Sequence, residues 1–139
     1  MADIIFDSGL VEYNLNGRCK VVFNPTDMAF IERVFEVFDT LDEKQESYRT
    51  AIDSKDGKEV FDIARRMNEE MRELIDGVFD TDVSSALFGE MSVYAVANGL
   101  PVWANLLLAV MDEMDSAFAR EKKLTNPRIQ KYTQKYRRK

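Results

Sequence analysis

The strongest constraint on the fold is a run of apolar residues between positions 60 and 78 whose spacing alternates between four and three: Val60, Ala64, Met67, Met71, Leu74 and Val78. This spacing puts all of them on one stripe of an α-helix that packs lengthwise along a near-parallel or antiparallel neighbour. The preceding segment supplies the neighbour, with apolar residues at helical spacing: Ile31, Val34, Phe35, Phe38, Leu41, Tyr48 and Ile52. The sequence therefore predicts a long helical hairpin with helices over 25–52 and 57–79.

Capping signals mark the ends of these two helices. In Asn24-Pro25-Thr26-Asp27, Asn24 is a good N-cap, and proline suits the first helical turn. Asp56 and Glu59 have the spacing of a capping box for the second helix. Asp80-Thr81-Asp82 is expected to end it.

The beginning of the chain predicts a β-hairpin over residues 9–23, because polar and apolar residues alternate on both sides of Asn16-Gly17. A two-residue turn would place Tyr13 opposite Lys20. A three-residue loop ending at Gly17 would place Tyr13 opposite Cys19. We favour the second register because it separates apolar from polar side chains across the two faces. A further short strand over 4–6 is a candidate.

Three more helices are expected after the helical hairpin, over about 82–88, 91–98 and 101–124. Gly89 and Gly99 stop the first two, and Pro101 opens the third. The third carries a long apolar stripe: Trp103, Leu106, Leu107, Val110, Met111, Met114 and Phe118. The predicted fold class is α+β and predominantly α-helical, with an N-terminal β-hairpin, a long helical hairpin, a C-terminal helical subdomain and a basic C-terminal arm.

Charge divides the chain sharply. Residues 120–139 carry nine basic and one acidic side chain, whereas the rest carries ten basic and twenty-four acidic ones. The net charges are therefore −14 for the body and +8 for the tail. We expect a single acidic domain over 1–124 and a basic arm over 125–139 that binds a partner in a salt-dependent way.

The arm has a helical pattern of its own. Asn126-Pro127 repeats the cap-plus-proline signal, and Ile129, Tyr132 and Tyr136 follow at helical spacing among basic residues. A basic amphipathic helix that orders on a partner is one interpretation, and a solubilising terminus is the other. The residues expected to bind a partner are Arg128, Ile129, Lys131, Tyr132, Lys135, Tyr136, Arg137, Arg138 and Lys139.

Composition excludes several classes of chemistry. The chain has no histidine, which removes histidine-based triads, cysteine–histidine dyads and zinc sites built on both residues. Cys19 is the single cysteine, so no intramolecular disulfide forms and a reducing compartment is expected. Its place on the apolar face of the hairpin favours a core role. We expect no cofactor, no metal, no targeting segment and no membrane span.

Acidic clusters occur on two of the predicted helices. Glu69, Glu70 and Glu73 are interleaved with arginines, Arg72 among them, which favours an exposed salt-bridged face over a metal or acid–base site. Asp112, Glu113 and Asp115 are interpreted in the same way. A group of phenylalanine and methionine residues is interpreted as core, with a groove for an apolar helix as the alternative: Phe30, Phe35, Phe38, Phe61, Met67 and Met71.

Three stretches of the chain carry a resemblance to a known family. They are residues 9–17 with 24–27, residues 98–105 (NGLPVWAN) and residues 126–132 (NPRIQKY). In these stretches the chain resembles tail assembly chaperones of long-tailed, siphovirus-type bacteriophages or prophages of gut Firmicutes. The resemblance spans nearly the whole chain and includes no catalytic signature.

The resemblance implies a non-enzymatic protein of the host bacterial cytoplasm that is absent from the mature virion. Its implied partner is the phage tape measure protein, which it keeps soluble, and tail tube subunits are a second candidate partner. No small-molecule substrate, nucleic acid or membrane is expected, and the oligomeric state stays open. Three alternatives remain: an acidic phage protein that inhibits a host defence nuclease by DNA mimicry, nucleic-acid binding through the arm, and, last, an enzyme that uses only carboxylates.

Overall fold

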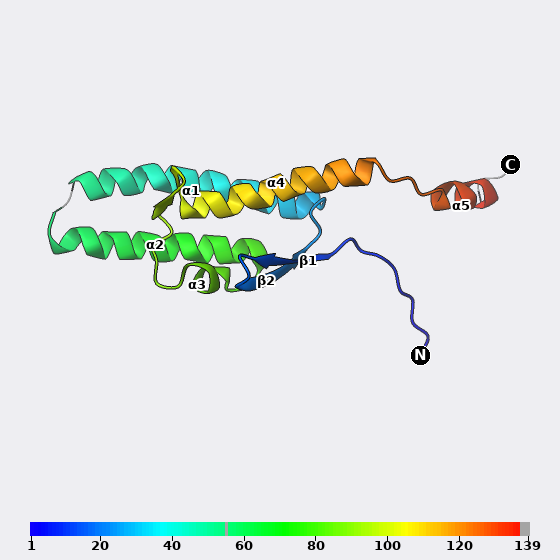
Figure 1. The fold of residues 1–139 in the computed structure, drawn as a ribbon, viewed down its shortest axis with the longest axis horizontal. Helices are drawn as coiled ribbons and strands as arrows, with labels where there is room; N and C mark the ends of the chain where they lie inside the picture. The colour runs from blue at the N-terminus through cyan, green and yellow to red at the C-terminus, as the bar shows by residue number, and fades with distance from the viewer. Residues whose placement is uncertain (55, 137–139) are drawn as a thin grey trace.

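The computed structural model describes residues 1–54 and 56–136, and Figure 1 shows their arrangement. A two-stranded hairpin, β1 (Val11–Leu15) and β2 (Cys19–Phe23), is followed by two long helices, α1 (Met28–Ser54) and α2 (Lys58–Phe79). The chain continues through the short helix α3 (Val83–Phe88) and a small hairpin, β3 (Val96–Ala97) and β4 (Leu100–Pro101). It ends with α4 (Val102–Lys122) and α5 (Arg128–Tyr136). The predicted α+β, predominantly helical fold class is confirmed.

The helical hairpin is also confirmed: α1 and α2 run antiparallel, and α4 lies along α1 (Figure 1). The core lies among these three helices and the β1–β2 hairpin. In the seam of α2, Met71 and Val78 are fully buried, and Ile75 joins them. Trp103 ties α4 to α1, because its ring meets Phe38 edge-on at 5.4 Å and its Nε1 donates to Gln45 Oε1 at 2.9 Å.

Both helix starts differ from the predicted caps. The predicted start of α1 at residue 25 is wrong, because Asn24 Oδ1 accepts from Thr26 N and forms a local turn instead. The side chain of Asp27 then accepts a hydrogen bond from the backbone N–H of Ala29. The capping box at Asp56 is wrong as well: Gly57 is the N-cap of α2, with φ 63°, and no side chain caps it. Glu59 is therefore the second residue of the helix, whereas a capping box requires the glutamate at the third.

The first hairpin forms, but neither predicted register is correct. Its three-residue loop comprises Asn16, Gly17 and Arg18, one position later than expected, so Tyr13 pairs with Val21 and Leu15 with Cys19. Asn16 and Gly17 both have positive φ, as in the turns that suit twisted hairpins, and Arg18 N donates to Leu15 O at 2.9 Å. This register still collects the apolar residues on one face, and Val21 and Phe23 are buried there.

The helix expected over 91–98 is wrong. This segment forms turns and then the two-residue strand β3, which pairs with β4 around Asn98 and Gly99. Both turn residues have positive φ, which identifies Asn98-Gly99 as a hairpin turn and not a helix stop. Asn68 Oδ1 of α2 also accepts a hydrogen bond from the backbone N–H of Val93 at 2.8 Å, which holds this segment against α2.

Three polar residues of α2, spaced four apart, hold the segment that follows it. Asn68 binds Val93 as described, Arg72 Nη2 donates to the carbonyls of Gly89 and Met91, and Asp76 accepts from the amides of Val83 and Ser84. The surface-ion-pair interpretation of Arg72 is therefore wrong, because this guanidinium binds backbone carbonyls. The three side chains fix α3 and its following turn against α2.

The two ends of the described chain extend from this body (Figure 1). Residues 4–6 do not form the candidate strand, and Ile4, Ile5 and Phe6 are exposed. At the other end, α5 forms as the pattern predicts, with Asn126 Oδ1 accepting from Arg128 N at 3.1 Å. No helix within 1–54 and 56–136 combines the length and apolar character required to cross a membrane.

Candidate partner-binding groove

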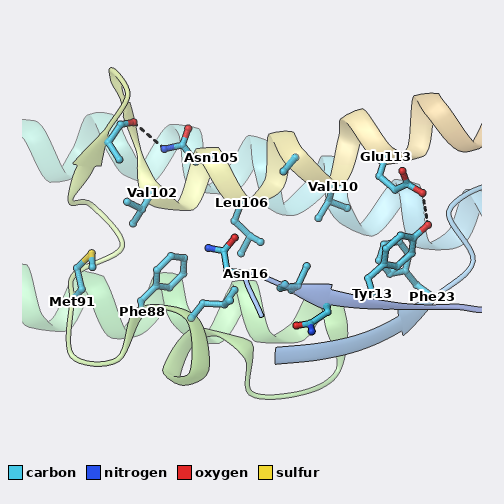
Figure 2. Close-up of a pocket in the computed structure, with 15 residues that line it drawn as sticks. Tyr13, Asn16, Phe23, Phe88, Met91, Val102, Asn105, Leu106, Val110 and Glu113 are labelled. Carbon is cyan, nitrogen blue, oxygen red and sulfur yellow. Dashed lines mark hydrogen bonds between the residues drawn. The ribbon is translucent and has the colours of Figure 1, made fainter. Parts of the chain in front are cut away.

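A groove of about 510 Å³ lies between the β1–β2 hairpin, α3 and α4 (Figure 2). Its lining is apolar or aromatic except for three asparagines and one glutamate: Tyr13, Asn14, Leu15, Asn16, Phe23, Leu87, Phe88, Met91, Ala97, Val102, Asn105, Leu106, Ala109, Val110 and Glu113. In Figure 2, α4 forms one wall, and the hairpin and α3 form the other. The volume falls within the range of ligand sites and the composition is typical of them.

Aromatic packing supports the hairpin wall of the groove. The Phe23 ring lies between Tyr13, at a centroid distance of 4.5 Å, and Phe30 of α1, at 4.2 Å. Phe30 is buried, so the stack joins the lining to the core. Because the Phe23 ring is held between rings from β1 and α1, this wall is preformed.

A side-chain hydrogen bond fixes the opposite end of the groove. Asn105 Nδ2 donates to the carbonyl of Ala97 at 2.9 Å, which binds the β3–β4 hairpin to α4 (Figure 2). Met91, half-exposed, reaches the groove from the turn that Arg72 holds. A flexible thioether at the mouth lets the site adapt to side chains of different shape.

A three-residue cluster closes the hairpin end. Glu113 Oε2 accepts from the Tyr13 hydroxyl at 2.5 Å and from Arg120 Nη2 at 2.8 Å. Burial, and then the hydrogen bond to Glu113, raise the pKa of Tyr13 to about 12. The bonds from Arg120 and from Tyr13 hold the pKa of Glu113 below its usual value. Glu113 is therefore ionised at neutral pH and pairs with Arg120, as the salt-bridged interpretation of this residue predicts, although its side chain is partly buried at the edge of the groove.

The predicted arm residues lie apart from this groove. Arg128, Ile129, Lys131, Tyr132, Lys135 and Tyr136 are all in α5, which has no buried residue. The Tyr132 and Tyr136 rings stack at 6.4 Å, and Ile129 is 79% exposed. The arrangement is a basic helix with an uncovered apolar stripe. Arg137, Arg138 and Lys139 lie outside the described residues.

The phenylalanine and methionine residues of α1 and α2, for which a groove was the alternative to a core role, do not line the observed groove. Phe30 and Met71 are buried in the core, and Phe38 and Met67 pack against it. Phe35 and Phe61 are exposed, and neither lines the groove. Sequence periodicity missed the actual groove because its lining comes from two loops, three strands and parts of two helices. Cys19 packs against the core, as expected.

The acidic residues predicted to form clusters on α2 and α4 do not form a metal site within the described residues. Glu70 pairs with Lys44 at 3.3 Å, and Asp112 and Asp115 are exposed. Within the described ranges, no group of three His, Cys, Asp or Glu side chains is arranged to hold a metal ion. Comparison of the chain with protein-family models, curated proteins and solved structures finds no match.

Proposed function

We propose that this protein is a non-enzymatic tail assembly chaperone, which binds a long, apolar, helix-rich polypeptide such as the phage tape measure protein and keeps it soluble in the host bacterial cytoplasm. The observation that carries the proposal is the preformed apolar groove between the β1–β2 hairpin, α3 and α4. The resemblance in residues 9–17, 98–105 and 126–132 supplies the identity of the partner, and tube subunits are a second candidate.

The dimensions of the groove suit a helix of the partner. Along α4 the lining extends from Val102 to Glu113, a rise of about 16 Å at 1.5 Å per residue. That length accommodates about three turns of a helix, so apolar side chains at positions i, i+3 or i+4, and i+7 would enter the groove.

The net charge of the body supports a solubilising role. A body of net charge −14 repels other copies of the same complex, which opposes aggregation of an apolar client. The arm adds a second, oppositely charged surface with an exposed apolar stripe in α5. Neither surface requires a reacting group.

Co-expression with the tape measure protein tests the proposal. The native chain should raise the soluble yield of that protein and co-purify with it. Ala109→Lys, which adds a long charged side chain at an exposed lining position, should abolish the effect. Ala119→Lys, the same change at an exposed α4 position outside the lining, is the matched control. Equal yields with and without the native chain would refute the proposal.

One observation favours the DNA-mimic alternative enough to test it. Exposed carboxylates recur along α1 with spacings of four, three, four and three: Glu32, Glu36, Asp39, Glu43 and Glu46. Such a row resembles a line of phosphates, although the basic arm would oppose binding to a nuclease surface that attracts DNA. Competition with DNA for a host nuclease would support this function, and reversing Glu36 and Glu43 to lysine should then remove the inhibition.

A further inference from the structure

We infer that α5 of one copy docks into the groove of a second copy, so that the free protein covers its own binding surface in trans. The inference concerns the groove of the proposed function. Its test uses the purified protein alone, so its failure is distinguishable from failure to bind a client.

The two surfaces match in length and chemistry. The nine residues of α5 rise about 13 Å, within the roughly 16 Å of lining along α4. Ile129, Tyr132 and Tyr136 form the exposed stripe of a helix that would be buried in a groove lined by Leu15, Phe88 and Leu106. Tyrosine suits such a site because its ring buries apolar area while its hydroxyl can meet the polar groups at the rim.

Charge complementarity selects this occupant. The helix α5 carries Arg128, Lys131 and Lys135 and no acidic residue, whereas residues 1–119, which contain the groove, have net charge −14. Glu113 lines one end of the groove, and exposed Glu90 precedes the lining residue Met91 at the other. Lys131 and Lys135 flank the apolar stripe of α5, so they would lie at the rim near these carboxylates.

The linker opposes docking of α5 into the groove of its own copy. A turn follows α4, in which Lys123 N and Leu124 N donate to the carbonyls of Arg120 and Glu121. The four Cα steps from Leu124 to Arg128 span at most about 14 Å. Returning to Glu113 requires about 16 Å at the helical rise, because Leu124 lies eleven positions beyond it. With this turn intact, Arg128 stops about 2 Å short of the level of Glu113, so α5 could lie over only part of its own groove, whereas the groove of a second copy can accept the whole helix.

Each copy offers one arm and one groove, so two copies can exchange arms in a closed pair or associate head to tail. Sedimentation velocity of the full chain should therefore show an average mass that rises with protein concentration from micromolar to millimolar and falls at high salt. Ile129→Ser with Tyr132→Ser should weaken association by at least about tenfold, as loss of central aromatic contacts does. Gln130→Ser with Gln134→Ser changes the same helix outside the apolar stripe and should have no effect.

Mixing two defective variants gives the decisive result. Ala109→Lys blocks the groove and the Ile129→Ser/Tyr132→Ser variant lacks a functional arm, so each alone should be monomeric. Their equimolar mixture retains one good arm and one good groove, and it should form 1:1 heterodimers and nothing larger. A monomeric native chain at every concentration, undiminished association of the arm variant, or a mixture without heterodimers would each overturn the inference.

Discussion

The hydroxyl of Tyr13, at the groove end of the β-hairpin, donates a 2.5 Å hydrogen bond to the carboxylate of Glu113 on α4, one hundred residues later. Arg120, about two turns further along α4, binds the same carboxylate oxygen. The cluster joins the hairpin to the last core helix, and it places an ion pair at one end of a largely apolar groove.

Tyr13→Phe should lower the free energy of unfolding by about 1–2 kcal/mol, because it removes a hydrogen bond to a charged acceptor while keeping the ring stack with Phe23. Chemical denaturation of the native and variant chains measures the difference. Equal midpoints and slopes would show that the bond contributes nothing to the folded state.

Tyr94→Phe is the matched change with the opposite expectation. The Tyr94 hydroxyl is buried and has no hydrogen-bond partner within the described residues, while its ring stacks on Tyr48 at 3.7 Å. Phenylalanine keeps the stack and removes the unpaired polar atom, so stability should stay equal or rise by up to about 1 kcal/mol. A loss as large as that of Tyr13→Phe would reveal a partner for this hydroxyl and contradict the account.

The alkaline limb of stability should depend on the same two tyrosines. Burial is the first cause that raises each pKa from 10.0 to about 12. Their contribution to the free energy of unfolding is fully present below pH 10. It is lost as the pH rises toward 12, because the tyrosines of the unfolded chain release their protons first. Thermal melts from pH 9 to pH 12 should therefore fall less steeply for Tyr13→Phe/Tyr94→Phe than for the native chain. Parallel curves would contradict this origin.

Arg72→Ala should lower the free energy of unfolding by about 2–3 kcal/mol, because it removes a charged donor to the carbonyls of Gly89 and Met91. Arg65→Ala is the control, because the Arg65–Asp62 pair is exposed and should contribute at most about 0.5 kcal/mol. Arg72→Ala should also weaken client binding at temperatures where it stays folded, because Met91 loses its support. Equal stabilities of the two variants would show that Arg72 is a surface residue.

Periodicity predicted the elements that are single long helices, and it failed where tertiary contacts decide the backbone. The stripe from Val60 to Val78 was sufficient for the helical hairpin because its signal repeats over many turns. Residues 91–98 have helix-compatible composition, yet Asn68 and the Asn98-Gly99 turn impose another path. The register of the first hairpin shifted because two alternations fit the same sequence almost equally well.

The groove itself has no sequence signature, because part of its lining comes from residues 13–23 and the rest from residues 87–113, far later in the chain. Tyr13, Phe88 and Leu106 come from β1, α3 and α4, and only the fold brings them together. The arm, by contrast, was visible from its local charge and its cap-plus-proline signal. Local sequence patterns thus revealed the surface of α5, which a single helix forms, but not the groove, which forms only when several elements pack together.

Site-specific photo-crosslinking tests the central claim most directly. A photoreactive side chain at Ala109, exposed in the lining, should crosslink to a helical segment of the tape measure protein in the co-expressed complex. The same group at Glu43, exposed on α1 outside the lining, should not. Crosslinking at Glu43 with none at Ala109 would contradict the assignment of the groove as the client-binding surface.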